Sequence, residues 1–207
     1  KSNSENFLIY NNNYVPIEWD RVVLPFNRGG LKHTNGYKKM IEKRDISMFV
    51  THWDVCLNAK SCFKVLNNTK RKASIHFAID NDGTIYQLVD PQHIGWHAGN
   101  TRVNNTSIGI DFSNAYYMKY QNYYRKRGFG MRPVITDSVV HGVKLGDHLG
   151  YYDVQLDAYK ALLKCLLNHY NIEARCPLDE TGNTKREVEI SAAQGNFKGV
   201  VSHYHLT

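Results

Sequence analysis

The sequence predicts an α/β layer structure, on the basis of three features. Short apolar runs typical of β-strands occur at 46–54 and 106–114, and the stretch 74–90 has the pattern of a β-hairpin. The run 153–172 has the periodicity of an amphipathic helix. Strands that alternate with helices along a chain are typical of layered α/β folds. The length of 207 residues fits one domain with sizeable loops.

Each element follows from its own residues. In 74–90, two alternating runs flank the sequence DNDG, and an Asp-Gly pair suits a tight turn that needs positive φ. In 153–172, the apolar positions recur at helical spacing and Asp153 is the candidate N-cap. Residues 1–45 are polar and predict an irregular arm with one short helix near 36–44. The last stretch, 199–207, predicts a strand that runs into a loop.

The composition limits the class of protein. With 42% hydrophobic and 22% charged residues, the chain can bury a substantial core. No apolar run is long enough to span a membrane, and the N-terminal residues lack the apolar region of a signal peptide. The net charge of +7 favours polyanionic partners such as nucleic acid, acidic lipid or wall polymers, with simple solubility as the alternative. The four cysteines form no CxxC pair, which argues against a cysteine-only zinc ribbon.

Two histidines stand where buried strands end. His52 follows SMFVT, and His203 follows GVVS. Side chains at strand ends are rigidly placed and can converge, and two imidazoles suit Zn²⁺, which takes nitrogen or sulfur ligands. A single histidine at a strand end is more often structural, so each of them alone is a weak signal.

Asp111 and the motif GWHAGN add polar groups to the candidate site. Asp111 lies in the apolar run SIGIDFSN, where alternation places it on the opposite face from Ile108 and Ile110. A buried carboxylate is costly unless it is paired or used, whereas at an edge it would face water. In GWHAGN, Trp96 and His97 beside a glycine turn suit the lining of a cleft, and an ordinary polar loop is the alternative.

Taken in order, the motifs VTHWD, SIHFAIDNDGTIYQLVD, WHAGN, NNTSIGIDFSN and GVVSHYHLT resemble the zinc-dependent N-acetylmuramoyl-L-alanine amidases. This superfamily includes phage amidase-type endolysins, wall-recycling amidases and peptidoglycan recognition proteins. The resemblance implies a central mixed β-sheet flanked by helices. It also implies Zn²⁺ held by His52 and His203, Asp111 as the catalytic acidic residue, and Trp96 and His97 as substrate-binding residues.

The resemblance leaves part of the site open. The family's third zinc ligand and a catalytic Lys lie beyond its second His, and this chain ends at Thr207. We therefore expect a domain truncated at its C-terminus, or a degenerate site that binds wall fragments without cutting them. His205 or Cys56 could substitute as a ligand. Cys56 and Cys62 stand where recognition proteins often carry a disulfide, so the resemblance implies that they are bridged.

These inferences predict an N-terminal extension over 1–45 and an amidase-like catalytic domain over 46–207. The implied function is zinc-dependent hydrolysis of the amide between N-acetylmuramic acid and L-Ala of peptidoglycan, as in a phage or phage-like lysin. The alternative is a non-catalytic peptidoglycan-binding module with an incomplete zinc site. The implied partner is bacterial peptidoglycan, with no nucleic acid. The implied place of action is the bacterial cell wall, reached through a phage holin or supplied with the virion.

Overall fold

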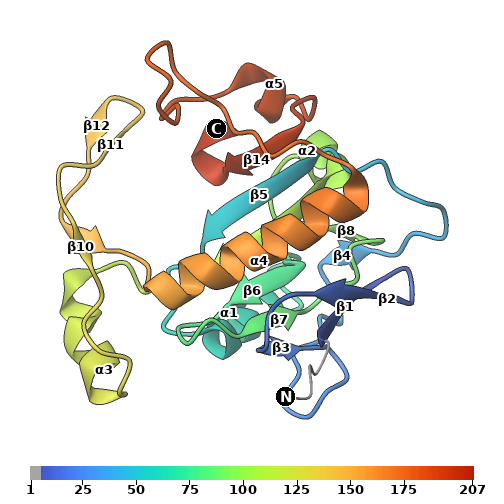
Figure 1. The fold of residues 1–207 in the computed structure, drawn as a ribbon, viewed down its shortest axis with the longest axis horizontal. Helices are drawn as coiled ribbons and strands as arrows, with labels where there is room; N and C mark the ends of the chain where they lie inside the picture. The colour runs from blue at the N-terminus through green and yellow to red at the C-terminus, as the bar shows by residue number, and fades with distance from the viewer. Residues whose placement is uncertain (1–5) are drawn as a thin grey trace.

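A six-stranded mixed sheet forms the centre of the protein in the computed structural model, which describes residues 6–207 (Figure 1). The strand order is β14-β5-β9-β6-β7-β3, and all neighbours are parallel except β6 and β7. The predicted mixed sheet is therefore confirmed. Its strands are β3 (Val22–Val23), β5 (Met48–Trp53), β6 (Phe77–Ile79), β7 (Ile85–Gln87), β9 (Ser107–Phe112) and β14 (Gly199–Ser202).

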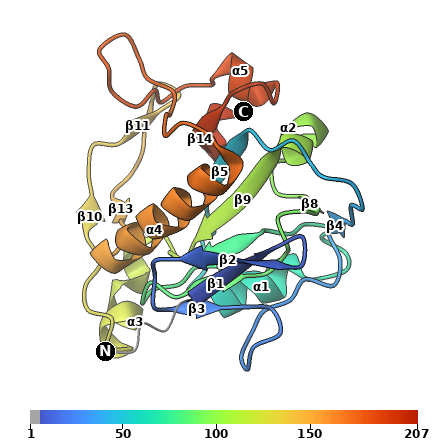
Figure 2. The ribbon, with the colours of Figure 1, turned by 45° about the vertical axis from the view of Figure 1, so that its right-hand side comes forward.

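Helices cover both faces of this sheet. Helix α4 (Asp153–Tyr170) crosses one face (Figure 2), where its Leu162 and Leu166 join the main core cluster with Phe49 and Ile110. On the other face α1 (Ala59–Leu66) packs through a smaller cluster. The two faces follow from strand alternation, because successive side chains of a strand point to opposite sides.

The hairpin prediction for 74–90 is confirmed. Strands β6 and β7 pair antiparallel, and the turn between them closes through hydrogen bonds between Asp80 and Thr84 and from Gly83 to Asp80. Gly83 has a φ of +80°, the left-handed conformation that the Asp-Gly pair predicts.

The helix prediction for 153–172 is confirmed apart from its cap. Tyr152, not Asp153, is the N-cap residue, and its backbone N–H donates to the side-chain oxygen of Gln155. Asp153 is instead the first helical residue, where its negative charge faces the positive end of the helix dipole. The helix ends at Asn171, whose φ of 52° is left-handed.

The helix expected near 36–44 is absent from the described structure, and that prediction was wrong. Strand β4 (Tyr37–Lys38) instead pairs with β8 (Ile94–Gly95). The physical reason is Arg44, whose buried guanidinium donates to the carbonyls of Pro91, Asn104 and Ser107 and ties the segment across the loops. Ile41 is 98% exposed, so the segment has no buried apolar face whose packing could stabilise a helix.

The remaining elements are short. Residues 113–152 leave β9 and lie beyond the carboxyl ends of β5 and β9 (Figure 1). There the Trp53 ring contacts the rings of Tyr116 and His148. No helix in the described residues is long and apolar enough to cross a bilayer. The remaining short helices and strands are α2 (Thr101–Thr106), η1 (Met118–Tyr120), α3 (Gln121–Lys126), β10 (Val134–Ile135), β11 (Val139–Val140), β12 (Val143–Lys144), β13 (His148–Leu149), α5 (Ile190–Ala193) and η2 (His203–His205).

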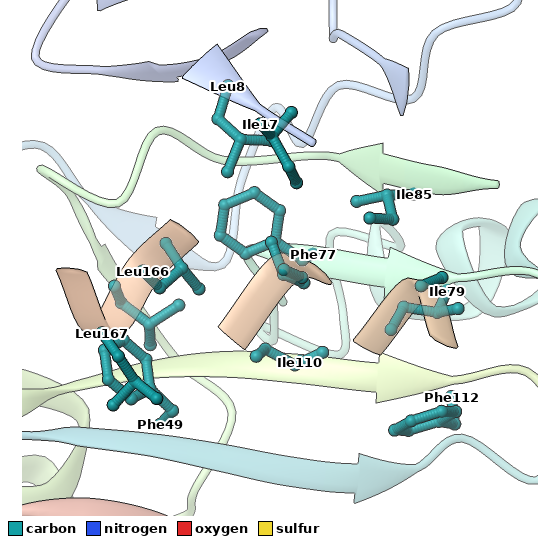
Figure 3. Close-up of a cluster of buried hydrophobic side chains, with 13 residues drawn as sticks. Leu8, Ile17, Phe49, Phe77, Ile79, Ile85, Ile110, Phe112, Leu166 and Leu167 are labelled. Atoms are coloured by element: carbon teal, nitrogen blue, oxygen red, sulfur yellow. The ribbon is translucent and has the colours of Figure 1, made fainter. Parts of the chain in front are cut away.

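Residues 6–17 form an ordered hairpin where an irregular arm was expected. Strands β1 (Asn6–Tyr10) and β2 (Asn13–Ile17) pair antiparallel around Asn11 and Asn12, which both have positive φ. Leu8 and Ile17 enter the main core cluster beside Phe77 (Figure 3). The hairpin therefore contributes to the same core as the sheet, while the predicted domain division at residue 45 stays a prediction.

Truncating Leu8 tests this contribution. Its side chain is 2% exposed, so Leu8→Ala should lower the free energy of unfolding by about 2–5 kcal/mol through lost burial and a residual cavity. Phe26→Ala is the control, since Phe26 is 63% exposed and should change stability by less than about 0.5 kcal/mol. Urea unfolding measures both. A Leu8→Ala effect as small as the control would show that the hairpin is not part of the core.

Candidate metal centre and active site

The two strand-end histidines lie side by side. Strands β5 and β14 are parallel neighbours with Thr51 opposite Ser202, so the residues that follow emerge at the same edge of the sheet. His52 is in β5, and His203 comes directly after β14 as the first residue of the 3₁₀ helix η2. Their ring centroids are 5.0 Å apart with an interplanar angle of 47°. The structure thus brings together the two imidazoles that the sequence singled out.

Asp111 lies on the same face of the sheet. It is paired in register with His52 across β5 and β9, and parallel partners point to the same side. That side is opposite α4, because the neighbouring Thr51 hydroxyl bonds Tyr159 of α4 on the other face. Ile108 and Ile110 pack into the α4-side core, as alternation predicted.

Asp111 is buried, with 5% of its surface exposed. Burial raises the pKa of its carboxyl to about 7, and the Cys62 thiol, which donates to Oδ2 over 3.4 Å, lowers it slightly. A carboxyl with such a pKa can take up and release a proton near neutral pH, as an acid–base group must.

His97 supports His52, and Trp96 is the more exposed of the predicted pair. The Nδ1 of His97 lies 2.9 Å from Nε2 of His52, and its Nε2 lies 3.2 Å from the Ser107 hydroxyl. Trp96 is 39% exposed. Gly109 makes room for this arrangement, since a Cβ there would lie 2.6 Å from Cγ of His97. No local pattern signals the His52–His97 contact, because it joins residues 45 positions apart.

The histidines of the site are held neutral. Burial, followed by the neighbouring imidazoles, moves the pKa of His52 and of His97 well below the ordinary value. Burial also lowers the pKa of His203. Neutral imidazole is the form that binds metal ions.

The residues present supply two of the three protein ligands that a catalytic zinc ion takes. The Nδ1 of His203 is buried and has no hydrogen-bond partner in the described structure, which is costly unless a ligand uses it. The neighbouring His52 ring supplies a second neutral nitrogen donor. Imidazole nitrogens are common zinc ligands, so His52 and His203 are the residues that would hold such an ion.

His205 is committed elsewhere. The predicted strand ends at Ser202, and residues 203–205 form a 3₁₀ turn directly after it. The Nδ1 of His205 accepts from the Ser202 backbone N–H at 2.9 Å, and its Nε2 lies 2.7 Å from the Lys185 carbonyl. Both ring nitrogens are therefore used, and His205 is not a candidate ligand.

Cys56 and Cys62 are both free thiols in the structure, in place of the bridge that the resemblance implied. Cys62 lies in α1 with its thiol directed at Asp111. Cys56 lies in the loop before α1, close to Cys62 and Asp54.

Removing His97 tests whether its contact with His52 supports metal binding. Loss of a partner that orients a ligating His typically costs about 10–100-fold in metal affinity, and we expect this from His97→Ala. Trp96→Ala is the matched control, because the Trp96 indole is exposed and the ring partners of His52 among the described residues are His97 and His203. This change should leave zinc affinity unchanged. Zinc competition against a chromophoric chelator measures both. Equal zinc affinity in His97→Ala and the wild type would contradict the supporting role.

A further buried histidine, whose ring lies beside that of His97, predicts acid lability. His76 is fully buried, accepts from the Gly109 N–H, and contacts the His93 carbonyl. Burial lowers its pKa to about 3, so the folded state binds fewer protons than the unfolded state between pH 3 and 6.5. Stability should therefore fall with decreasing pH below about 6.5, by up to about 1.4 kcal/mol per pH unit from this group. Urea unfolding at pH 7 and pH 5 measures the loss, which His76→Gln should reduce; an unchanged loss in that variant would contradict the assignment.

The family model for N-acetylmuramoyl-L-alanine amidase matches residues 42–205, most of the chain. No curated protein matches the chain.

The fold is shared with one solved amidase structure, and two further solved structures are similar at lower TM-scores. The amidase LysC from Clostridium intestinale URNW is 16% identical with a TM-score of 0.50, and the match covers 91% of this chain and 86% of LysC. AMPDH3 from Pseudomonas aeruginosa, in complex with anhydromuramic pentapeptide, is 22% identical with a TM-score of 0.46 over 82% of this chain and 55% of its own.

AmiD from E. coli, in complex with anhydro-N-acetylmuramic acid-L-Ala-D-gamma-Glu-L-Lys, is 23% identical with a TM-score of 0.44. The match covers 66% of this chain and 48% of AmiD, so the chain spans about half the length of AmiD and of AMPDH3. Because the family match extends over most of its length, the chain belongs to the N-acetylmuramoyl-L-alanine amidase family.

Proposed function

We propose that this protein hydrolyses the amide bond between the lactyl group of N-acetylmuramic acid and L-Ala of peptidoglycan, with zinc held by His52 and His203. The observation that carries the proposal is the convergence of two neutral imidazoles at one sheet edge, on the face that also carries Asp111. Both histidines and Asp111 lie within residues 42–205, the part that matches the amidase family.

The ion's contribution is Lewis acidity: when bound, zinc polarises the scissile carbonyl and lowers the pKa of water to about 7. Asp111 accepts a proton from the attacking water as the new C–O bond forms. It then donates that proton to the L-Ala nitrogen as the C–N bond breaks, so that the products are a carboxylic acid and a free amine, and the proton of the new acid passes to the amine or to solvent. Its buried position and its pKa of about 7 suit both halves of this transfer.

Other residues position the His52 ring and attract the substrate. His97 fixes the His52 ring through the 2.9 Å contact, and Ser107 in turn contacts His97. Trp96 offers an exposed indole that can pack on the sugar or peptide. The net charge of +7 attracts the carboxylates of stem peptides and the anionic polymers of a bacterial wall. We propose that the protein acts at that wall as a lysin of the phage type.

Digestion of purified peptidoglycan tests the proposal. Mass spectrometry of the soluble products should find stem peptides with a free L-Ala amine, and glycan strands with intact glycosidic bonds. A chelator should stop their release, and added zinc should restore it. His141→Asn is the control, since this exposed histidine lies outside the site and Asn tolerates its φ of 52°. Binding to the wall without any release of peptide would instead identify a non-catalytic binding module.

A further inference from the structure

A second group of metal-binding side chains lies beside the histidines. Asp54 and Cys56, in the loop after β5, meet Cys62 of α1, and one ligand atom from each lies within 4.8 Å of the other two. Among the described residues, it is the one group of at least three acidic, cysteine or histidine side chains that lie close enough together to share an ion. Cys62 is buried, with 5% of its surface exposed.

Asp54 has an unused oxygen. Its Oδ1 accepts from the backbone N–H groups of Cys56 at 2.8 Å and Asn114 at 3.1 Å, which fixes the carboxylate. Its Oδ2 is buried and has no hydrogen-bond partner in the described structure. A buried carboxylate oxygen without a partner is costly, and a cation is the ligand that removes the cost.

The backbone on both sides is held in place. Val55, between the two loop ligands, has a φ of 54°, a conformation that a β-branched residue rarely adopts. Helix α1 begins with a capping box in which Asn58 and Ser61 exchange hydrogen bonds, and this fixes the start of the helix that carries Cys62. The three side chains are thus presented by a strained turn and a capped helix rather than by a free loop.

We propose that Asp54, Cys56 and Cys62 bind a second transition-metal ion, separate from the one at His52 and His203. Two thiolates and one carboxylate suit zinc or another borderline-soft divalent ion. Binding releases the two thiol protons, so Cys62 stops donating to Asp111 and leaves that carboxylate free to accept a proton. The proposal does not rest on the amidase activity.

Cobalt binding to the reduced, full-length chain tests the site, because Co²⁺ bound by thiolate shows a near-ultraviolet charge-transfer absorption. The wild type and His203→Ala should show the absorption. The double variant Cys56→Ser with Cys62→Ser should lose it. Cys176→Ser should keep it, since Cys176 is exposed and outside the cluster. Asp54→Asn should weaken cobalt binding by about tenfold or more while the circular dichroism spectrum stays native.

Several results would overturn the proposal. These are no absorption in the reduced wild type, or an absorption that persists in the double cysteine variant. Loss of the absorption in a folded His203→Ala would show that the thiolates serve the histidine ion rather than a site of their own. A Cys56–Cys62 disulfide that survives reductant would also exclude the site.

Discussion

Asp111→Asn should lower the rate of peptide release from peptidoglycan by about 10²–10⁴-fold, the range that a general acid–base group contributes. The amide matches the carboxyl in size but cannot accept and return the proton. Because Asp111 is not one of the proposed ligands, zinc bound at the histidines should remain. Initial rates on purified peptidoglycan and zinc content per chain are the measurements.

Asp157→Asn is the matched control for this substitution. Asp157 is an exposed residue on α4, on the opposite side of the sheet, and its change should leave the rate unaltered. Near-normal activity in Asp111→Asn would remove Asp111 from the proton transfer and leave its burial as a structural feature alone.

His203→Ala should abolish activity and weaken zinc binding at the histidine site. Loss of a residue that only supports a ligand costs about 10–100-fold in metal affinity, and loss of the ligand itself should cost more. The buried Nδ1 of His203 has no partner within the described chain, so removing the ring should cost little stability. Zinc competition and urea unfolding on the same samples separate the two effects. His141→Asn should match the wild type in both. A His203→Ala protein that binds zinc and cleaves normally would contradict the site.

The sequence predicted the parts of the fold that local pattern determines. The 74–90 hairpin rests on a turn residue with positive φ at Gly83, and the 153–172 helix rests on apolar periodicity. His52 and His203 could be singled out because both follow apolar strands, and parallel neighbours end at a common edge. That the two strands are neighbours is a matter of topology, which came from the family resemblance and not from the residues themselves.

Other parts depend on contacts between distant residues, which local pattern does not report. The short helix expected near 36–44 is overridden by the hydrogen bonds of Arg44 to carbonyls far along the chain. His205 is not available as a metal ligand, because its Nε2 contacts the Lys185 carbonyl. The β1–β2 hairpin did carry a signal, because consecutive Asn residues between apolar-rich runs suit a turn with positive φ at both centres.

The central claim is that His52 and His203 share one ion. NMR of the histidine side chains during addition of zinc to the metal-free protein tests it most directly. The ring signals of His52 and His203 should change together, in a single titration step, while those of the exposed His141 stay fixed. Zinc binding that leaves either of the two site rings unperturbed would contradict the account.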